Sequence, residues 1–217
     1  MGKYYPDSKV EISGFAAKHY DRLLDIFTLN RYKSFIKKAI QLMNIKPSDK
    51  ILDLGADTGR NSCLMRNHLL SEGEIIGLDI SNDMIAQFKD KCKNYSNIKI
   101  LNKRIDLPLD YNEYFDKAFI SFVLHGFPQE AREIIIDNVF RALKENGEFF
   151  ILDYNSFSLD ESPFYIKSIF KLIECHYAYD FIERDWQEIL LSKGFNNFKE
   201  HLFFRNYIRL IKVVKEG

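Results

Sequence analysis

Two acidic residues stand near the ends of consecutive apolar stretches, around a turn that contains two glycines. Asp53 lies in the stretch Lys50–Leu54, the turn is Gly55–Gly59, and Asp79 ends the next apolar run. Glycines let a backbone pass close to a ligand where Cβ atoms would collide. The helix expected after the turn has an N-terminus that favours carboxylates and phosphates. An acid about 20 residues further on suits ribose hydroxyls, so the pattern predicts a site for a nucleoside-containing cofactor.

The turn lacks the glycines of the dinucleotide fingerprint G-x-G-x-x-G, and an acid just ahead of the first glycine suits a cationic ligand better than a pyrophosphate. The stretch Asp53-Leu54-Gly55-Ala56-Asp57-Thr58-Gly59 resembles instead the first motif, D-x-G-x-G-x-G, of the class I S-adenosylmethionine (SAM) methyltransferases. Gly55 and Gly59 match that motif, whereas Asp57 replaces its middle glycine. The alternative is an ordinary strand, turn and helix without a ligand.

The resemblance implies that SAM is the cofactor and S-adenosylhomocysteine the product. It assigns Asp53 and the turn to the methionine end of SAM, and Asp79 to the ribose hydroxyls. Ile80 is expected against the adenine, and so is Met84, for which core packing is an equal alternative. The full set of expected cofactor contacts is Tyr20, Asp53, Gly55, Ala56, Asp57, Gly59, Asp79, Ile80, Met84, Arg104, Ile105 and Phe122.

The loop after the third expected strand departs from the family. Residues 102–109 resemble a G-D-A-x-x-L-P-F pattern, but Lys103 stands where the family has the Asp that accepts from the adenine amino group. Lysine has donors only. Either Asp106 or a backbone carbonyl accepts instead, or SAM is bound more loosely.

The loop after the fourth expected strand, residues 121–128, lies where ligands bind in open α/β sheets. It lacks the N-P-P-Y or D-P-P-Y motif of the methyltransferases that act on nucleobase amino groups. His125 is the candidate catalytic base for an O–H, N–H or S–H acceptor. The alternative is a histidine that holds the loop by hydrogen bonds.

An aromatic segment, 154–181, follows the fifth expected strand. Its rings suit a lid over a flat or apolar acceptor, and Tyr154, Phe164 and Tyr177 are the candidate substrate contacts. Asp153, beside Tyr154 at the end of the strand, is a weaker candidate for a substrate contact. A subunit contact, which would make the chain a homo-oligomer, and simple core packing are the alternatives for this segment.

The stretch Phe15–Arg22 resembles the A-x-x-Y-D opening of the ubiquinone/menaquinone C-methyltransferase-like (type 11) group, in which the segment covers the cofactor. This likeness implies the role of Tyr20, and an amphipathic helix packed on the sheet is the alternative. Resemblance to the group extends from about residue 15 to 153.

Strands and helices alternate, which predicts an α/β fold with a parallel sheet and helices on both faces. Strands are expected at 50–54, 74–79, 98–101, 115–122, 148–153, 197–204 and 206–214, and helices at 16–44, 59–70, 82–93, 129–144 and 184–193. Ser81 is the expected N-cap of the helix from 82, and Asn146-Gly147 the expected C-cap after 144. The resemblance implies a Rossmann-like seven-stranded sheet whose last strand is antiparallel, in one domain, 1–217, with an N-terminal helical cap at 1–46.

Lysine and arginine total 31, as do aspartate and glutamate, so bulk charge gives no attraction to nucleic acid. Three widely spaced cysteines argue against a disulfide framework or a metal site and fit a reducing cytoplasm. We expect neither a secretion signal nor a membrane span.

The leading hypothesis is therefore a SAM-dependent methyltransferase for a small apolar or aromatic acceptor. A small-molecule thiol or hydroxyl methyltransferase with His125 as base is a second hypothesis. A third, favoured by Asp57 and Lys103, is a non-catalytic binding module with the same fold.

Overall fold

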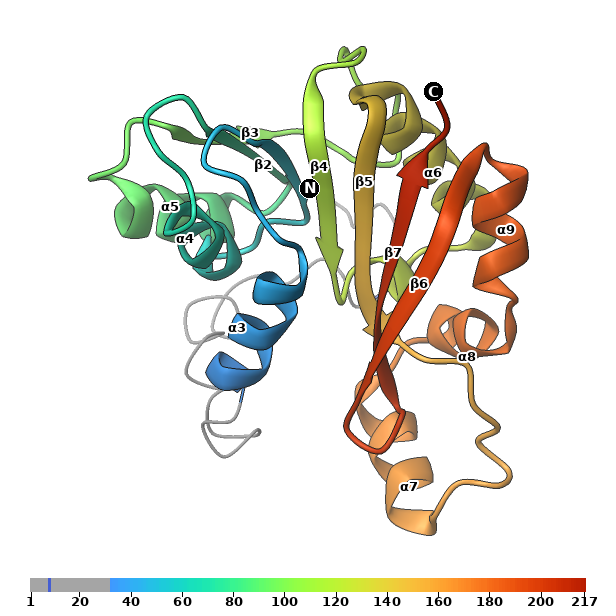
Figure 1. Cartoon of the computed structure of the whole chain (residues 1–217). Helices are drawn as coiled ribbons and strands as arrows, with labels where there is room; N and C mark the ends of the chain where they lie inside the picture. The colour runs from blue at the N-terminus through green and yellow to red at the C-terminus, as the bar shows by residue number, and fades with distance from the viewer. Residues whose placement is uncertain (1–7, 9–31) are drawn as a thin grey trace.

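The computed structural model describes residues 8 and 32–217, and in this part of the chain seven strands form one sheet in the order β3-β2-β1-β4-β5-β7-β6. The strands are β1 (Lys50–Leu54), β2 (Glu74–Asp79), β3 (Ile98–Asn102), β4 (Phe115–Ser121), β5 (Leu143–Tyr154), β6 (Phe195–Phe203) and β7 (Ile208–Lys215). Strands β1 to β5 are parallel, and β7 is antiparallel to both β5 and β6 (Figure 1). The predicted fold class, including the antiparallel last strand, is confirmed.

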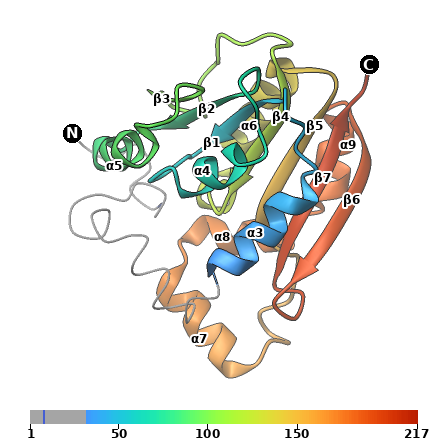
Figure 2. The same cartoon turned by 60° about the vertical axis from the view of Figure 1, so that its left-hand side comes forward.

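Helices cover both faces of the sheet. They are α3 (Tyr32–Leu42), α4 (Arg60–Arg66), α5 (Asn82–Cys92), the 3-10 helix η1 (Leu124–Gly126), α6 (Gln129–Ala142), α7 (Phe164–Ile173), α8 (His176–Glu183) and α9 (Trp186–Ser192). Residues of α3, α4 and α5 pack in one core cluster, and those of α6, α8 and α9 in another. Figure 2 shows α3 and α6 on opposite sides of the strands. None of the described helices is long and apolar enough to cross a membrane.

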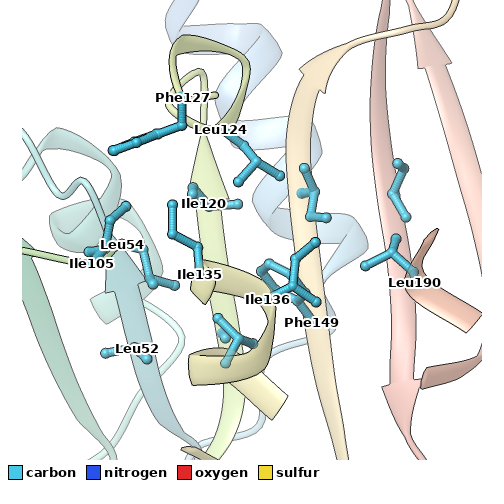
Figure 3. Packing of buried hydrophobic residues seen from close by; sticks show 14 of the residues in the cluster. Leu52, Leu54, Ile105, Ile120, Leu124, Phe127, Ile135, Ile136, Phe149 and Leu190 are labelled. Carbon is cyan, nitrogen blue, oxygen red and sulfur yellow. The ribbon is translucent and has the colours of Figure 1, made fainter. Parts of the chain in front are cut away.

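The two clusters follow from the alternation of side chains along each strand, because successive Cβ atoms point to opposite faces. In β1, Leu52 and Leu54 belong to the cluster that contains Ile135 of α6 (Figure 3). Ile51 precedes Leu52, points to the opposite face of the sheet and belongs to the cluster that contains Ile36 of α3. All these side chains are inaccessible to solvent, and each contributes roughly 1.5–3 kcal/mol of burial free energy. The sheet is thereby fixed in register at its centre, where the ligand-binding loops begin.

Several expected boundaries are correct. Strands β1 and β2 begin and end as predicted, and Ser81 caps α5 by accepting a hydrogen bond from the Met84 N–H at 3.4 Å. The hairpin between β6 and β7 passes through Arg205 and Asn206, and both residues have positive φ. The described part of the predicted 16–44 helix is α3.

The prediction of Asn146-Gly147 as a helix C-cap is wrong. Helix α6 ends at Ala142, and the next residue, Leu143, is already extended and fully buried in β5. Asn146 has φ 60° inside the strand, beside a register shift between β4 and β5. Burial of Leu143 against the sheet ends the helix before the pair, so Asn146 supplies a bulge conformation there.

Candidate functional site

Asp53 lies near the carboxyl end of β1 and is almost completely buried, with 2% of its surface exposed. The Ser62 hydroxyl, on α4, donates a hydrogen bond of 2.5 Å to its carboxylate. Burial raises the pKa of Asp53 to about 7; the Ser62 hydrogen bond opposes this shift, and the nearby charge of Asp79 adds to it. The ionised form of Asp53 is therefore costly in the absence of a cation.

Asp79 holds the end of β2 against the glycine turn. Its Oδ1 accepts the Ser81 N–H at 2.8 Å, and its Oδ2 accepts the Asp57 N–H at 3.0 Å. Burial raises the pKa of Asp79, and these backbone hydrogen bonds lower it, with burial the larger effect. Two buried acids with raised pKa values thus lie at the ends of adjacent strands, an environment that favours a positively charged ligand.

Three residues of the turn have left-handed backbone, and Asp57 is one of them. Gly55, Asp57 and Gly59 have φ values of 69°, 46° and 78°, all in the left-handed region. A Cβ on Gly55 would lie 2.6 Å from Val123, and one on Gly59 would lie 2.7 Å from the Phe88 ring. Aspartate tolerates this conformation better than most residues. Asp57 therefore adds a carboxylate to the turn while adopting the left-handed backbone.

The loop after β3 engages its charged side chains within itself. Arg104 donates two hydrogen bonds to Asp106, of 3.1 and 2.5 Å, and Asp106 is buried. Lys103 pairs with Asp110 at 2.7 Å, while its backbone N–H bonds the Asp79 carbonyl. The lysine side chain is thus directed to Asp110.

The remaining expected contacts lie nearby. Ala56 donates its N–H to the Leu78 carbonyl. Met84 and Ile105 are buried, and Ile80 is half-buried. The Ser121 hydroxyl, at the end of β4, is buried without a hydrogen-bond partner among the described residues. Tyr20 lies outside the described residues.

These groups fit the cofactor that the resemblance implies. SAM has a positively charged amino group and sulfonium, which two buried acids attract. It also has ribose hydroxyls that a carboxylate such as Asp79 accepts well. The turn has left-handed backbone where a side chain on Gly55 or Gly59 would collide with its neighbours.

His125 joins the ends of β4 and β5. Its Nδ1 lies 2.7 Å from Asp153, and its Nε2 lies 3.2 Å from Glu174. The Tyr154 hydroxyl donates to the same Glu174 at 2.5 Å, and the His125 N–H donates to Asp153. We refer to His125, Asp153, Tyr154 and Glu174 as the acid–histidine network.

Both ring nitrogens of His125 therefore face carboxylates. Burial alone lowers the pKa of His125, but Asp153 and Glu174 outweigh it and raise the pKa to about 10. The imidazole is protonated at neutral pH and donates at both nitrogens. This arrangement favours the loop-holding alternative for His125 over the role of catalytic base.

Arg132 of α6 is fully buried beneath this network. Its guanidinium donates to the carbonyls of Leu124, His125 and Tyr177 and to the carboxylate of Asp180. One side chain thereby joins α6, η1 and α8, and fixes the position of the loop that carries His125.

Aromatic rings surround the acid–histidine network. The Tyr154 ring lies 5.1 Å from the His125 ring, 6.2 Å from that of Phe122 and 5.2 Å from that of Phe170. Phe122 has φ 53°, a strained conformation for an aromatic residue. Strain of this kind clusters at ligand sites, and here it occurs directly after β4.

The candidate substrate residues are not all brought together. Tyr154 is part of the network, and Tyr177 is tied to it through the Arg132 hydrogen bond to its carbonyl. Phe164, on α7, is 81% exposed and contacts the Tyr165 ring. Figure 1 shows α7 apart from the sheet, beyond the end of β5.

Sequence reasoning missed Ser62, Arg132 and Glu174. Arg132 lies on an amphipathic helix, where an arginine is usually a solvent-facing residue. Glu174 lies within the aromatic segment 154–181, and nothing in its neighbours signals a partner 49 residues earlier. Ser62, in the helix after the turn, had no signal beyond its position.

Comparisons with known proteins bear on the family and the fold. A family model described as "Methyltransferase domain" matches residues 45–197. A demethylmenaquinone methyltransferase from Staphylococcus carnosus is 33% identical over 130 residues, which are 59% of this chain and 53% of that protein. One from Bacillus licheniformis is 26% identical, over 78% of this chain and 74% of its own length. The match to the first of these relatives thus spans about half of its length.

Among solved structures, a SAM-dependent methyltransferase from Aquifex aeolicus superposes with a TM-score of 0.69 at 15% identity. The superposition covers 93% of this chain and 99% of that one. At this identity the likeness is one of fold.

Proposed function

Because the chain belongs to the methyltransferase domain family, we propose that it transfers the methyl group of SAM to a small apolar or aromatic acceptor. The observation that carries the proposal is the pair of buried acids, Asp53 and Asp79, at the ends of adjacent strands around a left-handed turn. The cationic amino group would offset the burial cost of the Asp53 carboxylate, and the ribose hydroxyls would donate to Asp79.

Each part of the site has a role in this proposal. Asp79 would hold the ribose hydroxyls, and Asp53 and Asp57 the cationic amino group. When bound, SAM supplies a methyl group activated by a positively charged sulfur. The protein then needs to position the acceptor in line with the bond between sulfur and methyl, and to exclude water. The proposed mechanism therefore needs no nucleophile from the protein.

The acid–histidine network is the proposed acceptor end. His125, protonated and held by Asp153 and Glu174, positions η1 and the Tyr154 ring. The aromatic rings around it suit a flat acceptor. Two relatives carry the name demethylmenaquinone methyltransferase. The first acceptor to test is therefore demethylmenaquinone, reduced to its quinol so that the ring is electron-rich enough to accept an electrophilic methyl group.

The test has two steps, both with the full chain. Calorimetry with S-adenosylhomocysteine measures cofactor binding, and transfer from methyl-labelled SAM to the quinol and to a lipid extract measures activity. Asp79→Ala is expected to weaken binding by about 10- to 150-fold, since a hydrogen bond to a charged group contributes roughly 1.5–3 kcal/mol. Asp90→Asn, at an exposed surface ion pair, is the matched control and should bind as the wild type does.

Wild-type protein that fails to bind S-adenosylhomocysteine would overturn the proposal. Binding without transfer to any component of the extract would support the binding-module hypothesis instead. Unchanged affinity in folded Asp79→Ala would remove Asp79 from the cofactor site.

A further inference from the structure

Two cysteines that are 29 residues apart in the sequence meet between α4 and α5. The sulfur atoms of Cys63 and Cys92 lie 2.6 Å apart. A disulfide bond has a length of about 2.05 Å, so a shift of about half an ångström separates contact from bond. Both residues are present as free thiols.

The two thiols differ in a way that suits stepwise oxidation. Cys63 is half-buried and reachable from solvent, whereas Cys92 is 4% exposed. The Cys92 thiol hydrogen bond lowers the pKa of Cys63; burial opposes this shift, and the charge of Lys91 adds to it. The pKa of Cys92 is raised by the same hydrogen bond and by burial. Cys63 is thus the more readily ionised of the two, and the thiolate form is the nucleophile in thiol oxidation.

We propose that Cys63 and Cys92 form a reversible disulfide when the protein meets a hydroperoxide. The Cys63 thiolate attacks one peroxide oxygen, the O–O bond breaks, and Cys63 sulfenic acid and hydroxide result. The Cys92 sulfur then attacks the Cys63 sulfur and forms the S–S bond, while the sulfenic oxygen leaves as water with the Cys92 proton. In total two thiols and hydrogen peroxide give one disulfide and two waters, and the peroxide is reduced.

The bond would link α4 covalently to α5, beside the proposed cofactor site. Cys63 donates its N–H to the Gly59 carbonyl, and the Cys92 sulfur lies 4.0 Å from the same oxygen. The closed loop includes β2 and Asp79. A disulfide across about 30 residues stabilises chiefly by restricting the unfolded chain. The proposal is independent of which reaction the protein catalyses.

The test treats the full-length protein with hydrogen peroxide and then with dithiothreitol. Peroxide should remove two of the three thiols that alkylation detects, and peptide mapping should find residues 63 and 92 joined. The Tm should rise on the order of 5–10 °C and return after reduction. Cys175→Ser should lose two thiols in the same way, whereas Cys63→Ser and Cys92→Ser should form no internal disulfide and show no rise.

Three outcomes would overturn the proposal: wild-type protein that keeps all its thiols, a cross-link that involves Cys175, or sulfinic acid at Cys63 in place of a cross-link. Peptide mapping of the wild type decides among these even if a serine variant does not fold. If Cys63→Ser does not fold, Cys63→Ala takes its place in the Tm comparison.

Discussion

Burial of the Asp53 carboxyl has a cost that depends on pH. Its pKa is raised from 3.8 to about 7 in the folded chain. The folded state therefore binds this proton more tightly than the unfolded state does, and stability is lost as pH rises from about 4 to about 7. At 1.36 kcal/mol per pKa unit, the full cost above pH 7 is on the order of 4 kcal/mol.

Asp53→Asn should remove this cost, because an amide keeps the shape and still accepts from Ser62. We expect the variant to be roughly 2–4 kcal/mol more stable than the wild type at pH 8 and little different near pH 4. Urea unfolding across this pH range measures the effect. S-adenosylhomocysteine should bind more weakly to the variant, which separates stability from function. A variant that is less stable at pH 8 would contradict this account of Asp53.

The pKa of His125 is raised as well, but here the fold favours the charged form of the side chain. Its pKa is raised from 6.5 to about 10, so its stabilisation is complete below about pH 6.5 and is lost as pH rises through 10. His125→Gln should abolish that loss and remove the imidazolium that lies between the carboxylates of Asp153 and Glu174. We expect a destabilisation of about 3–5 kcal/mol at pH 7.

Unfolding at several pH values, with methyl transfer measured in parallel, checks this prediction. If His125 only positions the loop, the wild-type rate should show no titration near the ordinary histidine pKa of 6.5. A rate that rises through such a titration would restore the base role predicted from the sequence.

Arg132 connects three elements, α6, η1 and α8, through its hydrogen bonds. Arg132→Ala removes donors from carbonyls on η1 and α8 and leaves Asp180 with one fewer cation. We expect a loss of about 3–5 kcal/mol of stability. Arg141→Ala, on the exposed side of the same helix, should cost less than about 1 kcal/mol. Thermal unfolding compares the two, and equal effects would show that Arg132 is not the link described here.

Helix α7 presents a matched pair of phenylalanines. Phe170 is buried in the core cluster, whereas Phe164 is 81% exposed. Phe170→Ala should cost roughly 3–5 kcal/mol, and Phe164→Ala no more than about 0.5 kcal/mol. If α7 is part of an acceptor lid, Phe164→Ala should still lower kcat/KM for the acceptor with cofactor affinity within about twofold. An unchanged kcat/KM would remove Phe164 from the acceptor site.

Elements that consist of a continuous apolar stretch could be predicted from the sequence. Element boundaries that depend on contacts with residues far away in the sequence could not. Strand β1 was correct to the residue, because an apolar run bounded by turn residues has one stable place in a parallel sheet. The predicted end of α6 was wrong, because Leu143 pairs with Phe115 in the sheet. The helical pattern of the sequence gives no sign of that pairing.

The candidate site divides in the same way. Asp53, Asp79 and the turn are local in sequence, so their motif was recognisable before their geometry was known. The partners of His125 come from β5 and from the segment before α8, and the Cys63–Cys92 contact joins two helices. Such contacts depend on the completed fold, so spacing along the chain gives no sign of them.

For the molecule as a whole, cofactor binding should increase the free energy of unfolding. A ligand at 100 times its Kd stabilises the folded state by about 2.7 kcal/mol. S-adenosylhomocysteine should therefore raise the Tm by roughly 5–10 °C for a chain of this size. NADH, a dinucleotide, is the control and should give no rise, because the turn lacks the dinucleotide fingerprint. A larger rise with NADH would reverse the cofactor assignment.

The position of β7 between β5 and β6 has a consequence for synthesis on the ribosome. Strands β1 to β4, which include those that carry Asp53 and Asp79, can all pair once residue 121 has emerged, since they are neighbours in the sheet. Strand β6 is made before β7 but reaches the sheet only through it. Until residues 208–215 emerge, one edge of β5, which carries Asp153 and Tyr154, stays open to other chains. A translational pause before residue 208 would therefore expose the acceptor end to aggregation while leaving the cofactor end assembled.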